Sequence, residues 1–330
     1  MANFHEFDIG GIRIGGPVVL GPMAGVTSLA YRDFMKPFGV ALSYSEMISD
    51  YGLVYGNKET LSYCMTSKTD RPVGLQLFGN DVEITKKAIS ILEKDYDYDI
   101  LDINLGCPVY KVTKTGAGSA WLRNPAGLYE YMRAVVGVSH KPVTAKIRLG
   151  WDESSLNFET VCEVLERAGV KAISIHSRTS KQGYSGSARH ELLAGLGGRL
   201  SVPLVISGDI NDPLKAGRWM ELTGAKAVMV ARGGVGNPWL VSAINSQITR
   251  GSAIKRFSLE RQVDFASSFA ESLIAEKGER VAIMRLRGLL PHFFAGYPGS
   301  KRLSIEVSQT MASVEDLHKT MEGIRVRGHL

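Results

Sequence analysis

The sequence has few cysteines, and they are not placed to form a framework. Only Cys64, Cys107 and Cys162 occur in 330 residues. No pair of them has the spacing of metal ligands, and three thiols cannot make a disulfide scaffold. This excludes a disulfide-stapled secreted domain and suits a reducing, cytoplasmic location. We expect no metal in the functional site.

Long apolar runs are also lacking. No run reaches the ~18 residues that a membrane span needs. The first residues, MANFHEFDIGG, have neither the basic start nor the apolar core of a signal peptide. The net charge of +6 permits an anionic partner but does not identify one. We therefore expect a cytoplasmic protein without a membrane association, and a monomer.

The sequence does contain a regular alternation of short apolar runs and longer amphipathic stretches. The eight apolar runs are 18–24, 41–47, 73–79, 100–106, 143–150, 172–178, 204–210 and 227–234. Continuous apolar runs are typical of parallel strands that are buried on both faces. The glycine fingerprint of a dinucleotide-binding turn does not follow the first run, which disfavours an open doubly wound sheet.

These patterns predict an α/β protein with two parts. Residues 1–240 are expected to form a (β/α)8 TIM barrel that carries the catalytic site. Residues 241–330 contain no strong strand signal after about residue 255, and are expected to form a small helical domain.

The functional residues of such barrels come from the carboxyl ends of the strands. The candidates delivered there are Pro22, Met23, Ala24, Gln76, Asn104, Cys107, Lys146, His176, Arg178, Ser207, Gly208, Asp209, Ala231 and Arg232. Ser207, Gly208 and Asp209 stand in the turn at the end of the seventh run, and Ala231 and Arg232 in the turn at the end of the eighth. Both turns are glycine-rich, and backbone N–H groups there can face a phosphate. The alternative is that these glycines only close tight turns.

Two polar residues within apolar runs point to a flavin. Lys146 lies in VTAKIRL and Gln76 in LQLFG. A buried lysine suits an anion that develops during a reaction, and an amide can both donate to and accept from a flavin edge. Flavin mononucleotide (FMN) would use the phosphate turns, the lysine and the amide together. The alternatives are that Lys146 pairs with an inward acid and that Gln76 caps a neighbouring backbone group.

Cys107 stands on a Gly-Cys-Pro corner directly after a strand, followed by the loop YKVTKTGAG. A thiol of ordinary pKa is protonated at neutral pH and can act as a general acid. The rival role is a nucleophile, which requires a thiolate and a base, and His176 is a candidate for that base. Cys64 and Cys162 are expected to be structural.

The segments GPMAGVTSLAYRDF, GLQLFG, DINLGCPVYKVTKTGAGSAWL, VTAKIRLGW, ISIHSRT, SGDI and ARGGVGNPW together resemble the tRNA-dihydrouridine synthases, and most closely their bacterial B-type branch. The resemblance runs in order from about residue 16 to residue 239 and is weaker over the tail.

The resemblance implies an FMN enzyme that uses NADPH to reduce uridine in tRNA to 5,6-dihydrouridine. Hydride would pass from reduced flavin to carbon 6 of uracil, and Cys107 would protonate carbon 5. The implied FMN contacts are Pro22, Met23, Ala24, Gln76, Lys146, His176, Ser207, Gly208, Asp209, Ala231 and Arg232. Asn104, His176 and Arg178 would line the flavin and the flipped base, and the helical tail would grip the tRNA.

The tail has a basic stretch that fits this role. Between residues 280 and 305 the basic residues Arg280, Arg285, Arg287, Lys301 and Arg302 occur without an acid until Glu306, and Phe293, Phe294 and Tyr297 lie among them. Basic groups with stacking rings are typical of nucleic-acid binding. The alternative is that the rings belong to the core and the arginines are solvated.

The chain departs from the family pattern at four places. Ser207 stands where many members have Asn, Ala231 where they have Gly, and Gly288 and Leu289 where they have Lys and His. The main alternative function is that of an FMN barrel acting on a small pyrimidine-like molecule, and a second is a tRNA-binding protein with a structural flavin. The sequence leaves the modified position, the number of sites and the choice between NADPH and NADH open.

Overall fold

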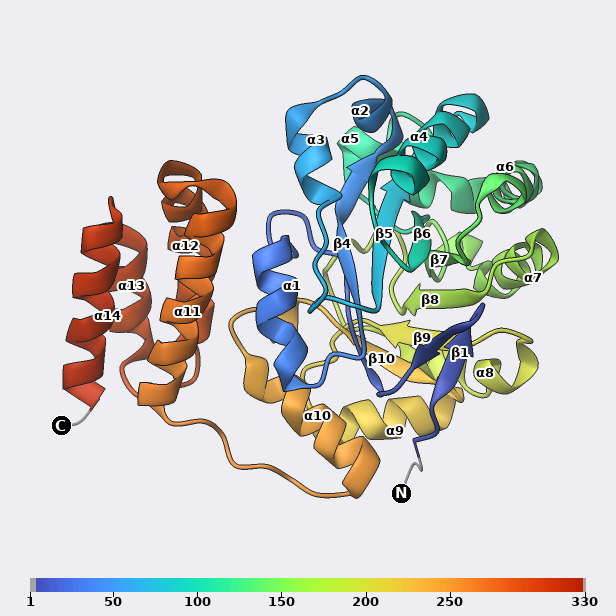
Figure 1. Ribbon diagram of the computed structural model, residues 1–330. Coiled ribbons are helices and arrows are strands. Elements are labelled where there is room, and N and C mark those ends of the chain that lie inside the picture. Colours follow the sequence, from blue (N-terminus) through green and yellow to red (C-terminus); the bar gives the residue numbers. More distant parts are fainter. Residues whose placement is uncertain (1–3, 329–330) are drawn as a thin grey trace.

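The computed structural model describes residues 4–328, which form a closed barrel with four further helices beside it (Figure 1). The barrel strands are all parallel and follow the order β10-β3-β4-β5-β6-β7-β8-β9. They are β3 (Val18–Leu20), β4 (Leu42–Ser49), β5 (Val73–Phe78), β6 (Ile100–Asn104), β7 (Val143–Arg148), β8 (Ala172–His176), β9 (Leu204–Ser207) and β10 (Ala227–Val230). The predicted (β/α)8 barrel with a helical C-terminal region is confirmed.

Most of the predicted strands run too far at their carboxyl ends. The first was predicted to continue to Ala24, but β3 ends at Leu20. The eighth was predicted to continue to Gly234, but β10 ends at Val230 and a 3-10 turn follows. The residues wrongly included in the predicted strands belong to the loops at the barrel mouth. The observed strand ends therefore mark where the loops of the site begin.

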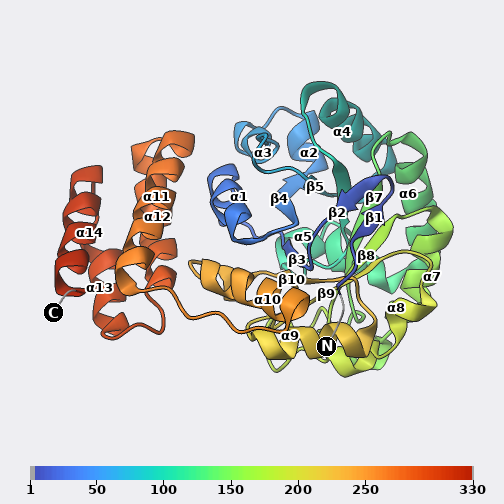
Figure 2. The same cartoon turned by 60° about the horizontal axis from the view of Figure 1, so that its bottom comes forward.

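The helices of the barrel surround the strands (Figure 2). They are α1 (Leu29–Met35), α2 (Asp50–Val54), α3 (Lys58–Tyr63), α4 (Val82–Asp95), α5 (Tyr110–Thr113), α6 (Pro125–Val138), α7 (Phe158–Ala168), α8 (Leu196–Arg199), α9 (Pro213–Thr223) and α10 (Pro238–Arg250), with 3-10 turns η1 (Lys36–Phe38), η2 (Gly118–Arg123), η3 (Glu153–Ser155), η4 (His190–Leu193) and η5 (Arg232–Gly234). No described helix is both long and apolar enough to cross a membrane.

A hairpin that the sequence analysis missed precedes the barrel. Strands β1 (Phe7–Ile9) and β2 (Ile12–Ile14) pair antiparallel through Gly10 and Gly11, both of which have positive φ angles (59° and 94°). Such a two-residue turn strongly favours glycine. Ile9 and Ile14 are fully buried and pack with side chains near the starts of the barrel strands. The hairpin therefore covers the amino-terminal end of the barrel, opposite the site. Strands of three residues are too short to show a period in the sequence.

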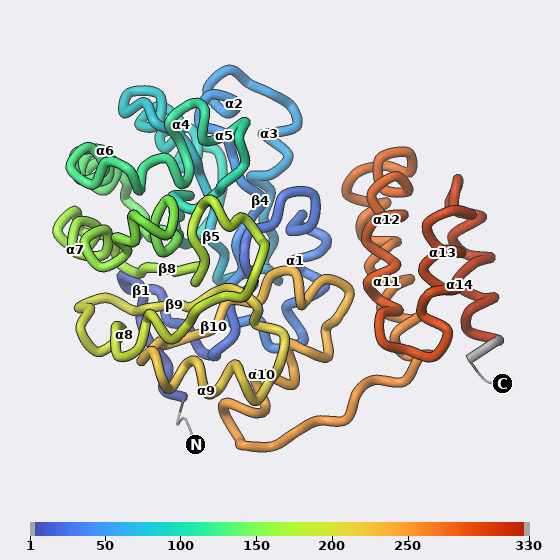
Figure 3. The backbone as a smooth tube through the Cα atoms, turned by 180° about the vertical axis from the view of Figure 1, so that it is seen from behind, coloured from blue at the N-terminus to red at the C-terminus, as the bar shows by residue number. Residues whose placement is uncertain are grey.

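The tail consists of α11 (Leu259–Lys277), α12 (Glu279–Phe293), α13 (Ser300–Thr310) and α14 (Val314–Gly328). Helix α10 runs across the expected boundary at residue 240 and packs against the barrel helix α9. A segment without helix or strand, residues 251–258, then connects α10 to α11 (Figures 1 and 3). We therefore propose to draw the boundary within 251–258 rather than at 240.

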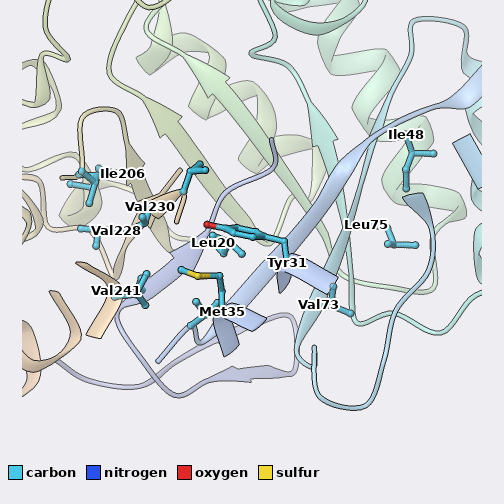
Figure 4. Close-up of a cluster of buried hydrophobic side chains, with 14 of the residues drawn as sticks. Leu20, Tyr31, Met35, Ile48, Val73, Leu75, Ile206, Val228, Val230 and Val241 are labelled. Atoms are coloured by element: carbon cyan, nitrogen blue, oxygen red, sulfur yellow. The ribbon is translucent and has the colours of Figure 1, made fainter. Parts of the chain in front are cut away.

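The tail packs on the barrel through α1. The ring of Phe34 contacts those of Phe265, Phe269 and Phe293, with centroids 5.6–6.3 Å apart. A carboxylate oxygen of Glu276 accepts a hydrogen bond from the backbone N–H of Ala30 at 2.7 Å. One apolar cluster runs from the barrel into the tail. Figure 4 shows its barrel part around Tyr31 and Met35, and the Tyr31 hydroxyl donates to the carbonyl of Gly234 at 2.8 Å. Because barrel and tail share a core, the tail is held in a defined position beside the barrel mouth.

Candidate active site

Two adjoining cavities open at the carboxyl ends of the barrel strands. One has a volume of about 330 Å³ and the other of about 440 Å³. Both are lined by Pro22, Met23, Lys146, His176, Tyr184 and Arg232. We call the first the anion cavity, because it adds the turns after β9 and β10. We call the second the thiol cavity, because it adds Asn104 and Cys107.

The anion cavity is shaped by glycines. Gly208 has a φ of 108°, and a Cβ there would lie 2.7 Å from Cδ2 of His176. A side chain is therefore excluded both by backbone conformation and by space. Ser207, Gly208 and Asp209 line one side, and Ala231, Arg232 and Gly233 line the other. These turns leave backbone groups accessible at the rim, as in the phosphate site of such barrels.

The walls of the cavities carry more cations than carboxylates. Within residues 4–328 the ammonium of Lys146 has no hydrogen-bond or ion-pair partner. Burial, followed by the charge of Arg148, lowers the pKa of Lys146 to about 8. Burial and the cations Lys146, Arg148, Arg178 and Arg232 also hold the pKa of His176 well below its usual value. His176 is therefore neutral at pH 7, and an uncompensated positive potential remains to attract an anion.

Arg148 holds two loops of the site together. Its Nε donates to the carbonyl of Gly106 at 2.8 Å, and its Nη1 donates to the carbonyls of Thr179 and Gly183 at 2.8 and 2.7 Å. Burial lowers its pKa to about 10, so it is still a cation at neutral pH. It ties the Gly-Cys-Pro corner after β6 to the loop after β8.

Cys107 lines the thiol cavity and is 8% exposed. Burial raises the pKa of its thiol, although a hydrogen bond from the backbone of Val109 and the charges of Arg148 and Lys146 oppose this. No side chain of the described residues hydrogen-bonds its sulfur, so His176 is not in position to act as its base in this structure. A protonated thiol without a base favours the acid role over the nucleophile role.

Gln76 and Asn104 lie side by side but differ in their access to the cavities. Asn104 lines the thiol cavity. Gln76 is fully buried and lines neither cavity. Its amide donates to Asp102 at 2.6 Å and accepts from Asn104 at 2.8 Å. The predicted contact of Gln76 with a flavin edge therefore stays a prediction, and the side-chain contacts observed for it are with neighbouring strand β6.

Arg178 does not face the cavities. Both of its terminal nitrogens donate to the carboxylate of Asp209, at 2.9 and 2.7 Å. Its other partners are the carbonyls of Ser185 and Gly186 and, 3.4 Å from Nη1, Nε2 of His176. Its side chain is 2% exposed. The expected contact of Arg178 with the substrate stays a prediction, and the contacts observed for it are all within the protein. Its observed role is to hold the turn that carries Asp209.

The four tail residues predicted to bind the substrate differ in their exposure and in their partners. Nη1 of Arg285 lies 3.3 Å from a carboxylate oxygen of buried Glu46, and Arg285 is only 17% exposed. Nε of Arg287 donates to the carbonyl of Ser308. Lys301 and Arg302 are exposed on α13. None of the four lines the two cavities.

The expectation of stacking rings in the tail is wrong for Phe293 and Phe294. They are 1% and 0% exposed and belong to the shared core. Tyr297 is partly buried, and its hydroxyl donates to the carbonyl of Phe257 at 2.9 Å. The spacing of these rings reflects packing, and any stacking on the tail surface must use other residues.

Several site residues were not identified from the sequence as site residues. Tyr184 lines both cavities, and the guanidinium carbon of Arg232 lies 4.2 Å from the centre of its ring. Leu289 and His292 reach the thiol cavity from α12. Tyr184 could have been suspected from its place in the loop after β8. Nothing in the sequence indicates that α12 forms part of the wall, since this depends on how the tail packs.

A parallel barrel with a glycine-lined anion cavity after its last two strands, and a thiol beside it, is typical of barrel enzymes that bind a phosphorylated ligand at the mouth. The family model described as Dihydrouridine synthase (Dus) matches residues 19–326. The chain belongs to the dihydrouridine synthase family, as the sequence motifs predicted.

Individual relatives agree with this assignment. The chain is 36% identical over 273 residues to a protein of Rhodobacter capsulatus named probable tRNA-dihydrouridine synthase, covering 82% of this chain and 84% of the relative. It is 32% identical over 292 residues to tRNA-dihydrouridine synthase B of Xanthomonas axonopodis pv. citri, covering 88% of each. It is 30% identical over 301 residues to tRNA-dihydrouridine synthase B of Pseudomonas aeruginosa, covering 91% of this chain and 90% of the relative. The predicted resemblance to the B-type branch is confirmed.

Proposed function

We propose that the protein reduces uridine in tRNA to 5,6-dihydrouridine, with FMN as the bound cofactor, NADPH as the reductant and Cys107 as the proton donor. The observation that carries the proposal is the shared wall of the two cavities. The ammonium of Lys146, which has no partner among residues 4–328, borders both the anion cavity and the thiol cavity with its protonated thiol.

The residues fit an FMN molecule. Its phosphate would lie against the turns that carry Gly208, Gly233 and Arg232, where the backbone is accessible. Lys146 would face the flavin ring and stabilise negative charge that develops on it. Pro22, Met23 and Ala24 lie on the rim and would support one side of the ring. When bound, the flavin supplies the hydride that uracil receives at carbon 6.

Cys107 completes the reduction by giving its proton to carbon 5 of the uracil. The corner that carries the thiol is fixed by two hydrogen bonds, because the backbone N–H groups of Gly106 and Cys107 donate to Oδ1 of Asn104 at 3.1 and 2.8 Å. A group that is already oriented loses little entropy at the moment of transfer. The proton that leaves is replaced from solvent at the cavity mouth.

The substrate base must leave its stack to enter a barrel mouth, which costs a few kcal/mol and is least costly in a loop of the RNA. The tail would hold the rest of the tRNA. Leu289 and His292 of α12 border the thiol cavity, and Arg280, Lys301 and Arg302 are exposed on the same tail. A small pyrimidine would need no such surface, and this favours tRNA over the alternative substrate class.

The test uses the full-length protein, tRNA that lacks dihydrouridine, and NADPH, with dihydrouridine measured by mass spectrometry of nucleosides. We expect a protein that purifies with a visible flavin spectrum and reduces tRNA but not free uridine. Cys107→Ala should keep the flavin and slow reduction by roughly 10²–10⁴-fold, the usual contribution of a general acid. Cys162→Ala, which removes a buried thiol of α7, is the matched control. Full activity of Cys107→Ala, or equal activity on free uridine, would contradict the proposal.

A further inference from the structure

The barrel interior contains an ionisable residue that no step above uses. Asp102 lies on β6, two residues before Asn104, and is 1% exposed. It lines neither cavity. Residues i and i+2 of a strand point to the same side, so Asp102 lies directly beneath Asn104. A buried carboxylate is costly unless other groups hydrogen-bond to it, and here two do.

A chain of hydrogen bonds leads from this carboxylate to the thiol corner. Thr144 Oγ1 and Gln76 Nε2 donate to the two oxygens of Asp102, both at 2.6 Å. Gln76 Oε1 accepts from Nδ2 of Asn104 at 2.8 Å. Oδ1 of Asn104 then accepts from the backbone N–H groups of Gly106 and Cys107. Three side chains therefore connect the barrel interior to the backbone of Cys107.

Asp102 fixes the orientation of the Gln76 amide. An ionised carboxylate only accepts hydrogen bonds, so Gln76 must turn its nitrogen toward Asp102 and its oxygen toward Asn104. The backbone N–H groups of the corner only donate, so they hold Oδ1 of Asn104 and leave its nitrogen to donate to Gln76 and to Sδ of Met47, at 2.8 and 3.0 Å. Asp102 and the Cys107 corner therefore require the same direction of the chain, and Asp102 anchors its inner end.

The charge of Asp102 has a second effect. Burial raises its own pKa to about 6, with the hydrogen bonds from Gln76 and Thr144 and the charge of Lys146 opposing this, so it is ionised at pH 7. The groups that act on Lys146 are Arg148, which lowers its pKa, and Asp102 and Cys107, which raise it. Asp102 pairs with Thr144 across β6 and β7, and Lys146 follows Thr144 by two residues, so the carboxylate and the ammonium belong to the same face of adjoining strands. A protonated thiol carries no charge, so Asp102 is the carboxylate that favours the Lys146 cation.

We propose that Asp102 is a positioning residue of the active site: its carboxylate anchors the hydrogen-bond chain that holds the Cys107 corner, and its charge keeps Lys146 cationic. The links to uridine reduction and to FMN binding rest on the proposed function. The effect on the thiol does not, because it can be measured without tRNA or flavin.

The first experiment measures the rate at which iodoacetamide alkylates Cys107 in the full-length protein. Cys64 and Cys162 are 0% and 1% exposed, so labelling reports on Cys107, with Cys107→Ala as the blank. Asp102→Leu removes the acceptor and frees the amide chain to reorient, and labelling should become about 10-fold faster as the corner opens more easily. The matched control is Asp99→Asn, next to the same strand at its other end, where Asp99 pairs with Arg71. It should label at the wild-type rate.

The second experiment tests the proposal with a milder variant, Asp102→Asn, in case Asp102→Leu does not fold. Asp102→Asn keeps the size of the side chain and can still accept from Gln76 and donate to Thr144, but it carries no charge. The pH at which FMN affinity falls, measured by flavin fluorescence, should move down by about one unit because the Lys146 cation loses its support. A residue that only stabilised the fold would not move this pH.

The proposal is overturned if Asp102→Leu folds and labels at the wild-type rate, or if Asp102→Asn leaves the pH dependence of FMN affinity unchanged. These outcomes are distinct from failure of the proposed function. If the wild-type protein forms no dihydrouridine in tRNA or binds no FMN, the labelling measurement still decides the role of Asp102.

Discussion

The barrel mouth and the helical tail both carry basic side chains, but they hold them differently. At the mouth, Lys146 lies at the carboxyl end of a buried strand without a partner in the described chain. On the tail, Arg285 is neutralised by Glu46, Arg287 bonds a carbonyl, and Lys301 and Arg302 are in solvent. A cation that is partly withdrawn from water and has no partner in the described chain is costly. It therefore indicates a ligand much more strongly than an exposed cation does.

The two regions are also joined by one carboxylate. Oε2 of Glu46 accepts from the backbone N–H of Gly25 at 2.5 Å, in the loop that carries Met23 and Ala24, and Oε1 faces Arg285 of α12. Arg285 thus fastens the tail to the rim of the site, and its contact with RNA stays a prediction. The comparison thus separates basic residues that assemble the protein from those that are free for a partner.

The largest effect should come from removing the cation at the mouth. Lys146→Met keeps the apolar stem and removes the charge, and we expect FMN affinity to fall about 10- to 100-fold, since hydrogen bonds to charged groups contribute roughly 1.5–3 kcal/mol. Titration of the protein with FMN, followed by fluorescence, measures this. Lys171→Met, an exposed lysine at the amino end of β8, is the control. If both variants bind FMN equally well, Lys146 contributes no more to FMN affinity than an exposed lysine does.

A smaller effect should follow from pH alone. The pKa of Lys146 is lowered to about 8, so the cation is present below that pH and lost above it. FMN affinity should therefore be constant from pH 6.5 to about 7.5 and fall as pH rises through about 8. In Lys146→Met the same titration should show no step near pH 8. A step of equal size in that variant would assign the transition to another group.

The smallest effects on ligand binding are expected on the tail. They should distinguish its exposed basic residues from the paired Arg285. Changing both Lys301 and Arg302 to Ala should weaken tRNA binding by about 10-fold and reduce its dependence on salt, as expected when two phosphate contacts are lost. Arg285→Ala should leave that salt dependence unchanged and lower the free energy of unfolding by roughly 3 kcal/mol, because it leaves the buried carboxylate of Glu46 without its cation. Filter binding at several salt concentrations and thermal unfolding measure the two. If Arg285→Ala reduced the salt dependence of tRNA binding and the change of Lys301 and Arg302 did not, Arg285 would have to leave Glu46 to bind RNA.

Much of the site could be predicted because a parallel barrel brings all its carboxyl strand ends to one rim. Once eight strands are recognised, Lys146, His176 and Cys107 must lie near one another. The resemblance to the family then implied FMN as the ligand. Gln76 shows the limit of this reasoning: it is on the correct strand, yet its amide is engaged beneath the rim by Asp102 and Asn104.

By itself, the sequence determined the barrel, the order of its strands and the position of the thiol at a strand end. These follow from local periodicity and from residues that are close together in the chain. Only the tertiary structure decided that Arg178 pairs with Asp209 and that Arg285 pairs with Glu46, 239 residues away in the chain. It also decided that Phe293 and Phe294 belong to the core. The physical reason is that a charge or a ring acquires its role from its partner, and these partners meet only when distant segments pack.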